Sequence, residues 1–188
     1  FFNILKMNLI AYFNTILANF PNSTIIFILL LSIIYWDANF LLLGSLLIVF
    51  GPILNQILKY LLRGLTISKR PNICGLVSDK DNTCSGCGVI IACKKTASSG
   101  MPSGHAQYMG ILSIFITIYL LKNNEVSTKL VAQITSVWIL TLLICYQRYI
   151  SKCHTILQIT IGLVVGCICG VLSYIIYSSI SMNQLNHL

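Results

Sequence analysis

The chain has 188 residues, of which 56% are hydrophobic and only 9% are charged, and its mean hydropathy is +0.86. Soluble domains carry about 25% charged residues, so these values exclude an ordinary soluble protein and predict an all-α membrane helix bundle in one domain, residues 1–188. The net charge of +8 suits a partner that carries phosphate. Because the basic residues flank apolar stretches, we expect no nucleic acid partner.

Apolar stretches recur along the chain, and a helix needs about 20 such residues to cross a bilayer. Five stretches predict spans: residues 24–36 with some flanking residues, 39–62, 105–121, 128–146 and 154–179. Residues 1–22 predict a poorly defined helix, either a sixth span or an interfacial helix, because asparagines and a lysine interrupt more than one of its faces. A sixth span makes Pro21–Ser23 a turn, and Gly51-Pro52 predicts a kink in the third stretch.

Alternation of the spans places the polar loop 63–104 and the turn 147–153 on one side of the membrane. Most of the basic residues lie on that side, which the positive-inside rule assigns to the cytoplasm. Residues that bind a substrate carry no information about insertion, however. Charge therefore leaves the orientation open.

The first motif is the end of the third span and the start of the loop. Arg63 is separated by six residues from Arg70, and Pro71 keeps Arg70 out of a helix. Two guanidinium groups placed in this way can hold different oxygens of one phosphate. A basic cluster at a membrane interface is the alternative interpretation.

The second motif is Ser99-Gly-Met-Pro-Ser-Gly-His105, directly before an apolar helix. Ser103 is the expected capping residue. The open N–H groups of such a helix, beginning with Gly104, favour an anion beside His105. The alternative is a capped helix whose histidine merely lies at the membrane surface.

The third motif is Arg148, followed after five residues by His154. Gln158 lies four residues further on, so it shares a helical face with His154. Its side-chain carbonyl can accept the Nδ1–H of His154 and leave Nε2 free as a nucleophile. A histidine at a helix end without a function is the alternative.

The three motifs together resemble the signature of the type 2 phosphatidic acid phosphatase superfamily, over roughly residues 40 to 180. Gly100–His105 and His154-Thr155 with Gln158 are most similar to its dolichyl diphosphatase branch. The resemblance implies a lipid phosphatase that needs no metal or cofactor and cleaves a polyprenyl diphosphate to the monophosphate and inorganic phosphate. It also implies an internal membrane such as the endoplasmic reticulum, with 63–104 as a lumenal active-site loop.

The resemblance implies a role for each matching residue. His154 attacks phosphorus and becomes a phosphohistidine, His105 protonates the leaving oxygen and then activates water, and Gln158 orients His154. The phosphoryl oxygens are held by Arg63, Arg70, Ser103, Gly104 and Arg148. Two residues depart from the family pattern, because Arg63 stands where lysine is usual and Gln158 where aspartate is usual.

Other functions fit parts of the pattern. The substrate of such an enzyme is alternatively phosphatidate or another lipid monophosphate, and a related enzyme transfers the head group to a second lipid. From other classes, a small anion channel or transporter and an inactive scaffold stay open. Asp79 and Asp81 form the only pair of nearby acids, which we interpret as a solvated turn rather than a metal site.

The chain has eight cysteines. Four lie in the loop (Cys74, Cys84, Cys87 and Cys93) and form two disulfides, bind zinc or stay free. Disulfides require an oxidising compartment, which a lumenal loop would provide. The four in or beside the spans (Cys145, Cys153, Cys167 and Cys169) are expected to pack as small apolar residues. The sequence gives no information on oligomeric state.

Overall fold

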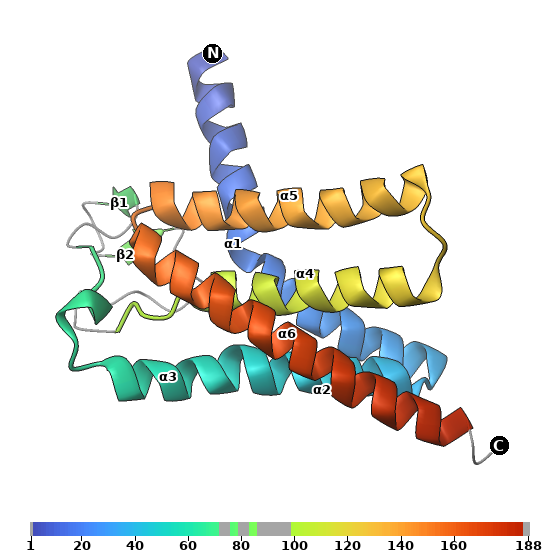
Figure 1. The fold of residues 1–188 in the computed structure, drawn as a ribbon. Helices are drawn as coiled ribbons and strands as arrows, with labels where there is room; N and C mark the ends of the chain where they lie inside the picture. The colour runs from blue at the N-terminus through green and yellow to red at the C-terminus, as the bar shows by residue number, and fades with distance from the viewer. Residues whose placement is uncertain (1, 72–75, 79–82, 86–98, 186–188) are drawn as a thin grey trace.

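The structure, a computed structural model, describes residues 2–71, 76–78, 83–85 and 99–185. Its helices are α1 (Phe2–Tyr35), α2 (Ala38–Ile48), α3 (Leu54–Leu62), α4 (Gly104–Asn123), α5 (Thr128–Ile150) and α6 (Ile156–Leu185). A π-helical turn, η1 (Val49–Ile53), joins α2 to α3. Within the described residues, five segments are long and apolar enough to cross a membrane: 12–35, 38–62, 104–123, 128–150 and 156–181. The predicted all-α membrane bundle is confirmed (Figure 1).

The alternative with a sixth span and a turn at Pro21–Ser23 is wrong, because α1 continues through Pro21 as one helix. Residues 2–22 therefore form the beginning of this helix and add no separate span. Proline lacks an N–H group, but a helix in an apolar environment survives because no water competes for its other backbone groups. In Figure 1, α1 changes direction partway along, so that its first half stands away from the bundle, and proline is the usual cause of such a bend.

The predicted kink in the third stretch is the π-helical turn η1, which contains Pro52. At its end, the N–H of Leu54 bonds to the carbonyls of Val49 and Gly51. The carbonyl of Phe50 is therefore available to another partner, and it accepts a hydrogen bond from the side chain of Gln107 in α4, at 2.7 Å. The turn thus ties α3 to the start of α4.

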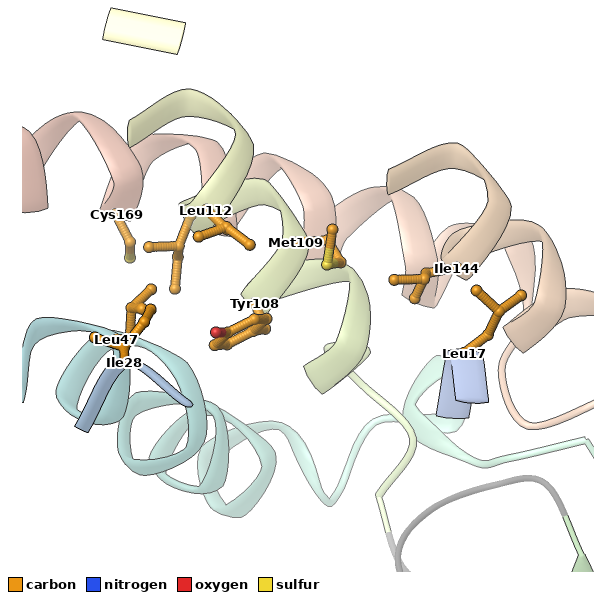
Figure 2. Close-up of a cluster of buried hydrophobic side chains, with 9 residues drawn as sticks. Leu17, Ile28, Leu47, Tyr108, Met109, Leu112, Ile144 and Cys169 are labelled. Carbon is orange, nitrogen blue, oxygen red and sulfur yellow. The ribbon is translucent and has the colours of Figure 1, made fainter. Parts of the chain in front are cut away.

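Helix α4 occupies the centre of the bundle and packs most closely against α6. Glycines of α6 make this approach possible: a Cβ atom on Gly162 would lie 2.5 Å from the carbonyl oxygen of Ser103, and one on Gly166 would overlap that of Gln107. Small residues allow membrane helices to approach in this way. Buried apolar side chains from α1, α2, α4, α5 and α6 fill the adjoining core, including Leu47, Met109 and Ile144 (Figure 2).

Four helix ends meet at one end of the bundle: the C-terminal ends of α3 and α5 and the N-terminal ends of α4 and α6 (Figure 1). The described parts of the 63–104 loop lie at this end. They are the short helix η2 (Thr66–Ser68) and an antiparallel pair of strands, β1 (Leu76–Ser78) and β2 (Thr83–Ser85). The three sequence motifs all lie at this end of the bundle.

Candidate active site

A network of side-chain amides holds α3 against the start of α4. Asn55 is only 4% exposed, and its Nδ2 donates to the carbonyl of Pro102 at 3.2 Å and to Oε1 of Gln107 at 2.8 Å. Gly104 fits beside it because a Cβ atom there would lie 3.0 Å from Oδ1 of Asn55. The network fixes the N-terminal end of α4, where the unpaired N–H groups of the first turn favour an anion.

Ser103 stands at the N-cap position of α4, as predicted, but its hydroxyl makes no capping hydrogen bond. The residue is fully buried, and its Oγ has no hydrogen-bond partner among the described residues. The backbone of Ser103 is instead held by the carbonyl of Gln158, which accepts its N–H at 3.0 Å. A buried hydroxyl without a partner is costly, and a phosphoryl oxygen at the end of α4 would satisfy it.

His105 lies in the first turn of α4, and its ring contacts α1. Its Nε2 is 2.8 Å from the carbonyl oxygen of Ala18. A carbonyl only accepts, so Nε2 carries the proton and Nδ1 of the neutral ring carries the lone pair. The imidazole is thus oriented by a helix outside the three motifs.

His154 precedes α6 by two residues, whereas the sequence predicted that it lies on the helix. It is 4% exposed, and its Nδ1 lies 2.8 Å from the carbonyl oxygen of Gly100 and 3.3 Å from Oε1 of Gln158. Both neighbours are acceptors, so Nδ1 carries the proton and Nε2 has a free lone pair. This tautomer is the one that a nucleophilic Nε2 requires.

The side-chain amide of Gln158 takes part in four hydrogen bonds, which fix both of its ends. Its Nε2 donates to the carbonyls of Ile67 and Lys69, at 3.0 and 2.8 Å, which turns Oε1 toward His154. With Thr155 it forms a reciprocal capping box at the start of α6, in which each backbone N–H bonds to the other side chain at 3.3 Å. Gln158 therefore connects the histidine to the segment that leads to Arg70.

Arg70 follows directly after this segment. The segment also pairs with the far end of the loop, since the N–H of Gly100 bonds to the carbonyl of Ser68 at 2.6 Å and the hydroxyls of Ser68 and Ser99 bond to each other. The Nε and Nη1 atoms of Arg70 are buried, and no hydrogen-bond partner for them lies in the part of the chain that the structure describes. Two guanidinium donors are thus held in place and left available for an anion.

Arg148 lies in the last turn of α5 and is completely buried. Its Nε donates to Oε1 of Gln147 at 2.6 Å, and Gln147 is fixed in turn by the hydroxyl of Ser151 at 2.9 Å. The chain then reverses through Lys152, whose φ of 51° lies in the left-handed region. Because of this reversal the backbone returns to the site, and His154, six residues after Arg148, lies in it.

The site concentrates positive charge, and the described carboxylates lie far from it. Burial first, and then the charges of Arg70, Lys59, His105 and Arg148, lower the pKa of His154 well below its ordinary value. Among the described residues, the acids are Asp37 before α2 and Glu125 after α4. Each is separated from the site by a helical segment of about 30 Å or more. A site that gathers charge of one sign attracts a ligand of the opposite sign.

A sequence model of the PAP2 superfamily matches residues 38–181, which is most of the chain. The chain belongs to the PAP2 superfamily. Membership makes this PAP2 protein a phosphatase of lipid-type phosphate esters, and its apolar helices make it an integral membrane protein. The superfamily resemblance of the motifs is confirmed. No curated protein and no solved structure matches the chain, so the dolichyl diphosphatase branch stays a prediction.

All eight predicted site residues of this PAP2 protein lie at one end of the bundle, and the structure places seven of them in or beside the site: His154, His105, Gln158, Arg70, Ser103, Gly104 and Arg148. The eighth, Arg63, is exposed, and its guanidinium lies 4.3 Å from the ring centroid of Tyr60. Lys59, which lies four residues earlier, carries a charge that contributes to the lowered pKa of His154. Sequence reasoning missed Lys59, although a lysine near the end of an apolar span was a usable signal.

One cysteine assignment of this PAP2 protein is corrected. Cys153, expected to pack as a small apolar residue, is disulfide-bonded, whereas Cys145, Cys167 and Cys169 are free. Its position in the α5–α6 turn beside the loop side of the bundle explains the difference, since it does not lie within a span. The side chains of the loop cysteines, and of Asp79 and Asp81, lie outside the described residues.

Proposed function

We propose that this PAP2 protein hydrolyses a polyprenyl diphosphate through a phosphohistidine on His154. One observation carries the proposal: a histidine whose Nε2 carries the lone pair lies where the positive charges of Arg70, Lys59 and Arg148 come together. A phosphoryl group carries the negative charge that such a cluster of cations attracts. Its reaction also requires the neutral nucleophile that the lowered pKa of His154 provides.

The proposed reaction has two steps. Nε2 of His154 attacks the terminal phosphorus, and the bond from that phosphorus to the bridging oxygen breaks. His105, whose neutral ring takes up a proton at Nδ1 when the anionic substrate binds, gives that proton to the leaving lipid monophosphate. Water then attacks the phosphorus of the phosphohistidine while His105 takes up its proton, which releases inorganic phosphate and restores His154. Arg70, Arg148 and the Ser103 hydroxyl stabilise the charge that develops on the phosphoryl oxygens.

The identity of Gln158 supports a diphosphate as the substrate. An aspartate at this position would stabilise the positive imidazole that forms as Nδ1–H polarises during attack, whereas a neutral amide only orients the ring. Weaker activation of the nucleophile suits a better leaving group. A lipid monophosphate, the leaving group from a diphosphate, is better than the alkoxide that leaves from phosphatidate.

The disulfide at Cys153 supports an active site on the oxidising side of the membrane, as in the lumen of the endoplasmic reticulum. It directly precedes the proposed nucleophile. The side of the membrane that carries His154 therefore faces the lumen in this proposal, despite the many basic residues there. Those residues bind substrate in the proposed site and so do not report on insertion.

The test is phosphate release by the purified protein in detergent, measured with polyprenyl diphosphates, phosphatidate and sphingoid phosphates, with and without EDTA. We expect release from the diphosphates, its persistence in EDTA, and its loss in His154→Ala. An acid-labile phosphate should be trapped on His154 of the wild-type protein. A matched control is Cys169→Ala, because Cys169 is a free, buried cysteine in the core and takes no part in the site.

Each alternative gives a different result in this experiment. A preference for phosphatidate would replace the proposed substrate by a lipid monophosphate. An anion channel or transporter would release no phosphate from any substrate. Loss of activity in EDTA that added Mg²⁺ restores would contradict the metal-free mechanism.

A further inference from the structure

Helix α3 places a second basic side chain near the site, on the face anchored by Asn55. Residues four apart lie on the same side of an α-helix, and Lys59 follows Asn55 by four residues. Asn55 is fixed against Pro102 and Gln107 at the start of α4. The anchored face of α3 therefore presents Lys59 one turn closer to the end of the bundle, beside the N-terminal end of α4.

The environment of Lys59 is unusual for a lysine in a span. The residue is half-buried, and within the described part of the chain it makes no hydrogen bond or ion pair. The positive charge of Lys59 interacts electrostatically with His105 and His154, and Lys59 is in turn repelled by the charge of Arg70. A half-buried ammonium group beside another cation is unfavourable unless an anion binds between them.

Arg63, the residue at the spacing expected from the motif, has the opposite environment. Helix α3 ends at Leu62, and Arg63 is its C-cap residue. Its side chain is exposed, and its guanidinium folds back over the ring of Tyr60. A cation that stacks on an exposed aromatic ring is already stabilised without a bound anion.

We propose that Lys59, rather than Arg63, is the cation of α3 that binds the phosphoryl group of the substrate. The inference rests on the proposed function, of which it specifies one contact. Lys59 lies one helical turn before Arg63. The residue at the usual motif spacing from Arg70 and the basic residue on the anchored face of α3 are therefore different residues in this chain. The lysine side chain is long enough to extend from the anchored face of α3 toward the phosphate held by Arg70 and Arg148.

The test compares three single variants in detergent: Lys59→Met, Arg63→Met, and Lys69→Met as a control, since the Lys69 side chain is exposed. Two quantities are measured, kcat/KM for a polyprenyl diphosphate and the rise in melting temperature that inorganic phosphate causes. We expect Lys59→Met to lose about 100-fold or more in kcat/KM, the usual effect of removing one group that stabilises a developing oxyanion. Its phosphate-dependent stabilisation should also disappear, and Lys59→Arg should recover part of both.

The loss in Lys59→Met should exceed that in Arg63→Met by more than about tenfold. The reverse ranking would overturn the inference and return the role to Arg63.

The phosphate measurement separates this inference from the proposed function. One outcome contradicts the proposed substrate and still supports the Lys59 site. In that outcome the wild type cleaves no polyprenyl diphosphate, and phosphate stabilises the wild type and Arg63→Met but not Lys59→Met. Equal stabilisation of wild type and Lys59→Met, or none in the wild type, overturns the Lys59 site. A melting temperature of Lys59→Met without phosphate equal to that of the wild type shows that the variant is folded.

Discussion

Replacing Gln158 by glutamate changes one atom of the side chain and separates its two roles. Glutamate keeps an oxygen near Nδ1 of His154 but puts a second oxygen where Nε2 now donates to the carbonyls of Ile67 and Lys69, at 3.0 and 2.8 Å. Each buried carbonyl left without a donor costs about 1–3 kcal/mol, so the sum is roughly 2–6 kcal/mol. Attraction between the carboxylate and the nearby cations offsets part of it, and we expect a net loss of about 2–4 kcal/mol in the free energy of unfolding.

The same substitution also changes the titration of His154. In the wild type, burial and then the neighbouring cations lower the pKa of this imidazole well below its ordinary value, so the nucleophile is neutral at any pH near 7. A carboxylate beside Nδ1 favours the imidazolium and raises that pKa. We therefore expect kcat/KM of Gln158→Glu to fall as the pH drops from about 7 to about 5. Protonation of His154 should lower kcat/KM of the wild type less over this range.

The assays are thermal unfolding in detergent and the pH dependence of kcat/KM. Gln158→Met is the matched control, because it removes both hydrogen-bonding roles without adding a charge. Gln158→Met should be less stable than the wild type, but the pH at which its kcat/KM falls on acidification should not move toward neutral pH. A Gln158→Glu protein with wild-type stability and a wild-type pH profile would refute the reasoning. It would mean that the amide does not join His154 to the segment before Arg70.

Three further changes have expected outcomes. Gly166→Ala should lower the free energy of unfolding by about 1–3 kcal/mol or more, because its Cβ atom would overlap the carbonyl oxygen of Gln107. Gly64→Ala should leave stability unchanged, because no described neighbour lies within 4 Å of its Cβ position. Thermal unfolding of the two variants compares them. Ser103→Ala should keep or slightly raise stability, because it removes a buried hydroxyl that has no partner, yet it should lower kcat/KM by about tenfold or more, and equal activity would remove Ser103 from the site. The free energy of unfolding should fall as the pH drops below about 6.5, because unfolded His154 takes up a proton that the folded protein resists; His154→Gln should reduce this dependence, which chemical denaturation at several pH values measures.

The sequence predicted the helices well because hydropathy reports burial in a bilayer directly. The segments 38–62, 104–123 and 128–150 lie within a few residues of the stretches expected from composition alone. The turn at Pro21 was wrong for a physical reason. Proline breaks helices in water, where the freed carbonyl finds a solvent partner, but in an apolar environment the remaining hydrogen bonds keep the helix intact.

The site was predictable where a motif fixes local geometry and less so where tertiary contacts decide. The capping box of Thr155 and Gln158 is a four-residue pattern, and it holds Oε1 near His154 as the spacing suggested. The second half of the Gln158 side chain could not be predicted, because its acceptors lie about 90 residues earlier in the chain. The contact between His105 and the carbonyl of Ala18 was equally hidden, since any residue type offers that carbonyl.

The contrast between Lys59 and Arg63 shows how spacing and geometry diverge at the end of a helix. A spacing motif counts residues from Arg70, but the side chain that reaches the site depends on where α3 stops and which of its faces is anchored. Asn55 anchors one face through two hydrogen bonds, and the helix ends at Leu62, before Arg63. The last full turn therefore carries Lys59 inward, and Arg63 begins the chain that leaves the bundle. We therefore expect the anchoring side chain of Asn55, rather than the residue count from Arg70, to decide which cation of α3 binds the phosphoryl group.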